Sequence, residues 1–231
     1  MKGRLGKFGF ILLALALCLS ITGAAFAKWS DTVTINGTVN TGTVSVGIHD
    51  LWLLDQGPDP QQSPGCNTEL KDIANHTSVN DGAVVCTRNI TGLGPRDFVD
   101  SVTETITNAY PYYKSGTTLM LCNCGSIPVK IDDIDLACVS GDEALLDYIT
   151  IGHWNIFTYN DITGDWPLYA TGEGWGSLET TLSGYQLESE PNLSVYFEFY
   201  FEEEVGGVVM PQDSSVTFTI TVTASQWNEV P

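Results

Sequence analysis

Apolar and polar residues alternate along several stretches of the chain, which is the pattern of β-strands that bury one face. The two clearest stretches are residues 193–202 and 216–223, where Leu, Val, Phe and Ile alternate with Ser, Thr, Tyr and Glu. Further strands are expected at residues 32–40, 44–48, 102–107, 119–131 and 150–159. We therefore expect an all-β fold, a jelly-roll-like antiparallel two-sheet sandwich.

Other stretches depart from this pattern. Residues 50–96 combine little periodicity with several Gly-Pro turns, so we expect a long loop insertion there. Residues 142–148, DEALLDY, carry the one good helical signal and predict one short helix. Turn residues around Gly206 and Pro211 link the last two strands, which predicts that these strands form an antiparallel pair.

The first 27 residues have the organisation of a secretory signal peptide. Lys2, Arg4 and Lys7 precede a nearly unbroken apolar run. Ala25 and Ala27 supply small residues for a signal peptidase, so cleavage is expected before Lys28. The apolar run is short for a bilayer-spanning helix, and no later stretch is long and apolar enough. We expect an exported chain that has no membrane span after cleavage.

Cleavage at this point leaves an alternating strand at the start of the mature chain. Residues 28–41 then form an N-terminal strand, and residues 42–231 form the sandwich domain with its insertion at about 50–96. Val33, Ile35 and Val39 point to one face of this strand. A strand at a free terminus pairs within its own domain or reaches into a neighbouring copy, and the alternation predicts both equally well.

The charge of the mature chain narrows the choice of partners. Six basic residues remain against 28 acidic ones, a formal charge of −22. Such a chain repels nucleic acid and anionic lipid and attracts divalent cations. Self-repulsion also opposes assembly, so a polymer of this chain requires a strong specific contact or counter-ions.

Five cysteines remain after cleavage, and export makes disulfides plausible. A local bridge between Cys66 and Cys86 would staple the insertion. Cys122 and Cys124 lie two residues apart on one strand, so each is expected to bond elsewhere, to Cys138 or to the insertion. Because the count is odd, at least one thiol is free or bonded to another chain.

Candidate binding and modification sites are scattered. Ca²⁺ binding, the one cofactor that the sequence suggests, rests on three acidic clusters, the last of which is Glu202, Glu203 and Glu204, and the alternative for each is a solvated acidic loop. The first cluster is Asp132, Asp133 and Asp135, and the second is Asp161 and Asp165. The N-x-S/T triplets place possible N-glycosylation at Asn36, Asn75, Asn89 and Asn192.

Catalytic signals are weak. The three histidines are scattered, and the chain has no zinc-protease motif, nucleophile elbow, P-loop or dinucleotide fingerprint. Two carboxylates are enough for a glycosidase, but nothing in the sequence selects a pair. We therefore expect a protein that is not an enzyme.

Several blocks of the chain resemble one family. The start of the mature chain (AFAKWSDT…VNTGTVSVGI) is similar to the processing site of proteins exported with the signal peptidase SipW. The blocks TITNAYP, CGSIPVKI and VTFTITVTASQWN are similar to conserved segments of the same group. This group is the TasA/camelysin family of secreted biofilm-matrix fibre subunits, which has archaeal relatives that form bundling pili. The resemblance covers the mature chain except residues 50–96.

The resemblance implies a secreted sandwich that assembles into fibres at the cell surface and in the extracellular matrix. In the relatives, the N-terminal strand of one subunit completes a sheet of the next by donor-strand exchange. Here the donor strand is about residues 28–40, with Trp29, Val33, Ile35 and Val39. The expected acceptor groove is lined by strands such as 117–124, 193–202 and 215–224. The partner is thus a second copy, with anchoring or nucleating matrix proteins as further candidates.

Two alternatives stay open. The first is a monomeric secreted module that binds Ca²⁺ or carbohydrate and keeps residues 32–40 in its own sheet. Aromatic residues at 154, 166, 169 and 175 suit sugar binding if exposed, and core packing if buried. The second is a surface hydrolase, because camelysin has been described as a metalloprotease. This chain shows no protease metal motif, so that activity is not carried over.

Overall fold

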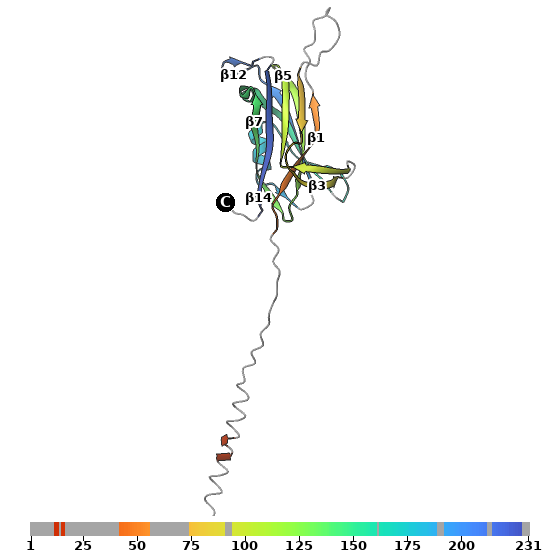
Figure 1. The fold of residues 1–231 in the computed structure, drawn as a ribbon, viewed down its shortest axis with the longest axis vertical. Coiled ribbons are helices and arrows are strands. Elements are labelled where there is room, and N and C mark those ends of the chain that lie inside the picture. Colours follow the sequence, from red (N-terminus) through yellow and green to blue (C-terminus); the bar gives the residue numbers. More distant parts are fainter. Residues whose placement is uncertain are drawn as a thin grey trace, which may run out of the picture. The chain divides into compact units, whose positions relative to one another are not determined.

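The fold is seen in a computed structural model of the full chain (Figure 1). The structure describes residues 12–13, 15–16, 42–55, 74–90, 94–160, 162–188, 192–211 and 214–227. The chain divides into two compact units, residues 1–40 and 41–231. In the first unit, the four described residues are helical and belong to the apolar run of the expected signal peptide. Within the described residues, no helix has the length and apolar character needed to cross a bilayer.

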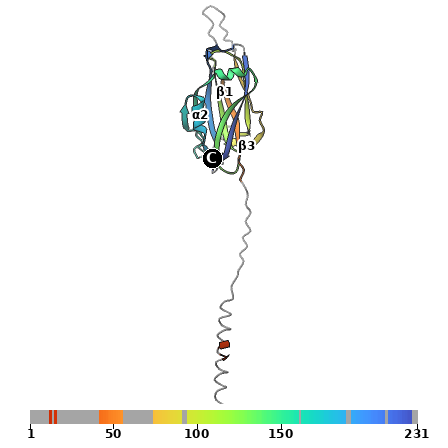
Figure 2. The same ribbon diagram turned by 90° about the vertical axis from the view of Figure 1, so that its left-hand side faces the viewer.

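The second unit is an all-β sandwich of two antiparallel sheets, as expected from the alternating strands (Figures 1 and 2). The larger sheet has seven strands in the order β3 (Val84–Ile90), β4 (Gly94–Val99), β1 (Val46–Asp55), β6 (Lys114–Asn123), β11 (Asn192–Phe201), β8 (Ile149–Thr158) and β9 (Leu168–Gly172). The smaller sheet has five strands in the order β10 (Gln186–Leu187), β7 (Val129–Gly141), β14 (Ser214–Gln226), β5 (Ser101–Ala109) and β2 (Asn75–Val79).

The core lies between the two sheets and is built from the alternating apolar residues. On β11, Leu193, Val195, Phe197, Phe199 and Phe201 are all fully buried. The apolar residues of β14 face them from the smaller sheet, and the rings of Phe199 and Phe218 meet edge to face at 5.7 Å. Burial of so many large apolar side chains is the main source of stability in such a sandwich.

The expected pairing of β11 with β14 is wrong, because the two strands lie in different sheets. β11 pairs with β6 and β8, and β14 pairs with β5 and β7. The connection contains its own small hairpin, β12 (Glu204–Val205) with β13 (Val208–Val209), after which the chain enters the other sheet. The apolar faces of β11 and β14 meet across the core, which the alternation of each strand allows as readily as pairing within one sheet.

The expected loop at 50–96 also contains sheet. β1 continues to Asp55, and β2, β3 and β4 follow. β3 (VVCTRNI) and β4 (GPRDFV) show no period-two pattern, and the register of β1 and β3 shifts at Asp50/Trp52 and at Val84/Cys86. Residues of β3, β4 and β6 form a second, smaller apolar cluster of Ile90, Phe98, Met120 and Cys122.

Two helices complete the domain. The expected helix at 142–148 is present as a 3₁₀ helix, η1 (Glu143–Tyr148), whose first turn is capped by the Asp142 carboxylate accepting from the Ala144 N–H at 3.2 Å. The sequence reasoning missed α2 (Trp175–Leu182). α2 follows Gly174, whose φ of 78° favours glycine, and it buries Leu178 and Leu182.

Candidate functional site

The candidate site is an incomplete edge of the smaller sheet, along β7. On one side, β14 pairs with β7 from Val129 to Gly141. On the other side, β10 pairs only with Val129 and Lys130, and the segment before β10 bonds to Ile131. From residue 132 to residue 141, no described strand pairs with this side of β7. A strand edge of this kind is a template for another strand.

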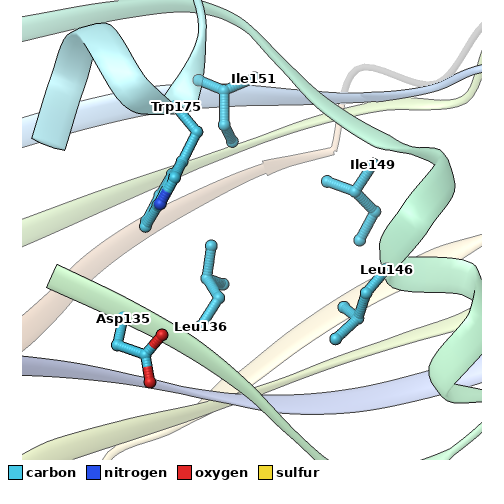
Figure 3. A pocket seen from close by; sticks show the side chains of 6 residues that line it. All are labelled: Asp135, Leu136, Leu146, Ile149, Ile151 and Trp175. Carbon is cyan, nitrogen blue, oxygen red and sulfur yellow. The ribbon is translucent and has the colours of Figure 1, made fainter.

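A pocket of about 300 Å³ lies beside this edge (Figure 3). Five of its six lining residues are apolar and come from β7, η1, β8 and α2. They are Leu136, Leu146, Ile149, Ile151 and Trp175, and Asp135 is the sixth. In Figure 3, Trp175 and Ile151 lie across the gap from Leu136, and Ile149 lies close to Leu146.

These apolar residues belong to the core but are incompletely covered. Leu136, Leu146, Ile149 and Trp175 pack against buried core residues and are only partly buried themselves. Trp175 is held in place by the ring of Phe197, which it meets edge to face at 5.9 Å. Cys138, also on β7, is likewise partly buried. The sandwich thus exposes part of its own core beside an unpaired stretch of backbone.

This edge differs from the acceptor expected from the sequence. The strands expected there are β6, β11 and β14, and each has strand neighbours on both sides. An interior strand has no unpaired backbone to offer, so these three cannot take up an added strand. The sequence signal that was missed is in β7 itself, where Leu136 and Cys138 alternate with the exposed Asp135 and Ala137.

The acidic residues of β7 do not converge on a shared ion site. The Asp132 carboxylate accepts a hydrogen bond from the Ser225 hydroxyl at 2.8 Å, and the Asp133 carboxylate accepts from the Ile134 N–H at 2.9 Å. Asp135 stands at the rim of the pocket. In the second expected cluster, the Asp165 carbonyl accepts from the Asn160 N–H at 2.9 Å. Asp161 lies outside the described residues, and Ca²⁺ binding stays a prediction.

The cysteines pair differently from the expected local bridge. Cys86 of β3 is bonded to Cys124, at the end of β6, which confirms a bond between this strand and the 50–96 region. The Cys66–Cys86 bridge is therefore wrong, and Cys66 lies outside the described residues. Cys122 is buried beside the disulfide, and its S–H donates to the Asn123 carbonyl at 3.6 Å. The sulfur atoms of Cys86, Cys122 and Cys124 all lie within 4.8 Å of one another.

A buried polar cluster was missed by the sequence reasoning. His76 of β2 contacts the Ser115 hydroxyl through Nδ1 at 2.6 Å and the Glu104 carboxylate through Nε2 at 2.9 Å. Thr117 donates to the same Glu104 oxygen at 2.9 Å. These residue types also form hydrolytic triads, but none of the four is more than 5% exposed, so a substrate cannot reach Ser115. Glu104 replaces an apolar residue between Val102 and Ile106, which is the signal that identifies it.

The same cluster perturbs Asp50 of β1. Burial and the nearby Glu104 carboxylate raise the pKa of Asp50 to about 6. The second oxygen of Glu104 is buried and has no hydrogen-bond partner among the described residues. The charged form of the Asp50 carboxylate is therefore a cost to the stability of the fold at neutral pH.

The remaining candidates are placed as follows. Asn75 on β2 and Asn89 on β3 are exposed, and Asn192 begins β11. The donor-strand residues Trp29, Val33, Ile35 and Val39, the cleavage residues Ala25, Ala27 and Lys28, and Asn36 lie outside the described residues.

Comparisons with known proteins add no family. The chain matches no model of a protein family, and no curated protein matches it.

Proposed function

We propose that this protein is the structural subunit of an extracellular fibre, of the kind that the TasA/camelysin resemblance implies. The N-terminal strand of one copy adds to the open edge of β7 in the next copy. The observation that carries the proposal is the unpaired stretch 132–141 beside an apolar pocket. An added strand satisfies the backbone groups of β7 and covers the exposed part of the core at once.

The pattern of the N-terminal strand suits this groove. Residues 32–40 are nine residues long, or about 30 Å when extended, and the open stretch of β7 has a similar length. Val33, Ile35 and Val39 share one face and can enter the pocket, while the threonines and asparagines of the other face stay in water. Residues 28–41 hold one Lys and one Asp, and cleavage adds an α-amino group at Lys28, so the donor is not acidic although the mature chain is strongly acidic.

The proposal takes the donor strand to pair with the next copy rather than within its own copy. Within the described residues, the strands of the sandwich begin at Val46, after the expected donor. When the donor of each copy enters the groove of the next, the contact does not close on itself and generates a filament. The proposal assigns the protein no catalytic role, and other matrix proteins would anchor or nucleate the fibre.

A cross-link tests the contact directly. Cys138 lies on the open stretch of β7, so Val33, Ile35 and Val39 are each replaced by Cys in the mature chain, residues 28–231. At least one of the three is expected to give a ladder of covalent multimers on a non-reducing gel, and Cys138→Ser should remove it. Thr34→Cys, on the opposite face of the donor, is the matched control.

Electron microscopy of the same preparations provides the second readout. We expect filaments from residues 28–231 and dispersed, folded particles from residues 42–231. Filaments from the truncated chain, or a ladder that survives Cys138→Ser in all three variants, would refute the proposed contact. An unfolded truncated chain would show instead that the strand belongs to its own sandwich.

A further inference from the structure

The outer face of the larger sheet carries a second groove, distinct from the one beside β7. Its volume is about 360 Å³, and it is lined by Trp52, Leu54, Thr118, Asn155, Phe157, Ser194 and Tyr196. The register of the sheet explains why these residues gather. Trp52 on β1 and Tyr196 on β11 both pair with Thr118 on β6, and Tyr196 also pairs with Asn155 on β8. Four neighbouring strands thus present one continuous row.

Aromatic rings dominate this row. Trp52 is 57% exposed although it is a large apolar side chain, and it pairs with Thr118 of β6, whereas β1 pairs with β4 only at Ile48. Gly116 provides room for the Tyr196 ring, since a Cβ at this position would lie 2.8 Å from the ring and from its hydroxyl. Phe157 pairs with Ser194 on the next row. The groove therefore has flat apolar walls that are open to solvent.

Polar groups lie between the rings. The side chains of Thr118, Asn155 and Ser194 form no hydrogen bond to another residue in the part of the chain that the structure describes. Ser194 is only 8% exposed, so its hydroxyl is largely removed from water and still lines the groove. Polar groups normally have hydrogen-bond partners, and these hydroxyl and amide groups line the groove that a ligand would enter.

The charge of the groove sets the class of ligand. All seven lining residues are neutral in a mature chain with 28 acidic residues. The next residue of β11 on the same face as Tyr196 is Glu198, whose carboxylate forms an ion pair with the Lys114 ammonium at 3.4 Å. An acidic polymer would be repelled by the protein as a whole, whereas an uncharged one would not.

We propose that this groove binds a neutral polysaccharide. Sugar rings stack on Trp52 and Tyr196 through their apolar faces, and their hydroxyls exchange hydrogen bonds with Thr118, Asn155 and Ser194. The groove lies on the solvent face of the larger sheet, whereas the proposed donor strand enters beside β7 of the smaller sheet. Glycan binding by this groove therefore does not depend on polymerisation, and a fibre would display one such groove on every subunit.

Binding is measured with mature protein, residues 28–231, and soluble hexasaccharides of β-1,4-glucose, β-1,3-glucose and α-1,4-glucose as neutral probes, with alginate as the acidic one. We expect at least one neutral probe to bind and to change the tryptophan fluorescence, and alginate not to bind. Trp52→Ala should weaken binding at least tenfold. Trp227→Ala, which removes an indole that is also half exposed but lies at the end of β14, should leave binding unchanged.

Three results would contradict glycan binding by this groove. Failure of all three neutral probes to bind, binding of alginate alone, or equal binding by Trp52→Ala overturns the proposal. If Trp52→Ala does not fold, Asn155→Ala decides, because it removes the amide and leaves the rings in place. Filament formation by Trp52→Ala is scored in parallel, so that a failure of glycan binding is not confused with a failure of assembly.

Discussion

At the scale of single residues, the least expected feature is a set of polar side chains in the core. The set is Asp50, His76, Glu104, Ser115 and Thr117. Asp50 and His76 lie in the region where the sequence predicts a loop, and the sequence does not show how the polar atoms of these five residues are satisfied. Contacts such as His76 with Glu104 join residues 28 positions apart, and a pattern read along the chain does not show them.

Asp50 gives a prediction about pH. The pKa of its carboxyl is about 6 in the folded state, above its ordinary value, so the folded state holds this proton more tightly than the unfolded state does. Protonation of the Asp50 carboxyl stabilises the folded state to its full extent below about pH 4, and this stabilisation is lost as the pH rises through 6. Asp50→Asn, which keeps an oxygen for the Trp52 N–H, should therefore raise stability at neutral pH by ~1–2 kcal/mol, after discounting for partial exposure.

The measurement is thermal unfolding of Asp50→Asn and of wild type at several pH values. The gain in Tm should grow between about pH 4 and pH 7, following the titration of the carboxyl. Asp147→Asn, at an exposed position of η1, is the matched control and should show no such trend. An equal gain in Tm at pH 4 and at pH 7 would mean that titration of the Asp50 carboxyl does not cause the gain.

At the scale of elements, strands with one buried face were readily predicted and irregular strands were not. β11 alternates apolar and polar residues, and β14 does so from Val216 to Thr223, whereas β3 (VVCTRNI) and β4 (GPRDFV) show no such alternation. α2 was missed because glycines surround Trp175 and suggest a turn. The open edge of β7 depends on which strands become neighbours, and such pairing is set by long-range packing rather than by local pattern.

The disulfide between β3 and β6 carries an element-scale prediction. The bond closes 38 residues, so its removal should cost about 3–4 kcal/mol. Cys86→Ser should show this full loss. Cys124→Ser should lose less, because the Cys122 sulfur lies within 4.8 Å of the Cys86 sulfur and can take its place in the bond. Peptide mapping under non-reducing conditions should find the Cys86–Cys122 bond in Cys124→Ser, and equal destabilisation of both variants would contradict this.

At the scale of the whole molecule, assembly must overcome strong like charge. Each mature copy has a formal charge of −22, while the proposed contact is made by a strand with one Lys and one Asp and by a mainly apolar pocket with one carboxylate, Asp135. Repulsion between copies acts over the Debye length, which is about 30 Å at 0.01 M salt and about 8 Å at 0.15 M. The strand contact itself acts at short range and is largely independent of salt. Filament growth should therefore be faster at the higher salt concentration, by roughly tenfold or more.

Light scattering of residues 28–231 at the two salt concentrations tests this. NaCl and CaCl₂ are compared at equal ionic strength. Screening depends on ionic strength alone, whereas specific binding of Ca²⁺ depends on which cation is present. Equal rates in the two salts would mean that screening is sufficient. A much faster rate in CaCl₂ would instead give the acidic residues of β7 a role as ligands between copies. Slower growth at higher salt would contradict a mainly apolar contact, since it would require that attraction between its few charges, such as Lys28 of the donor and Asp135 of the pocket, outweighs the repulsion between copies.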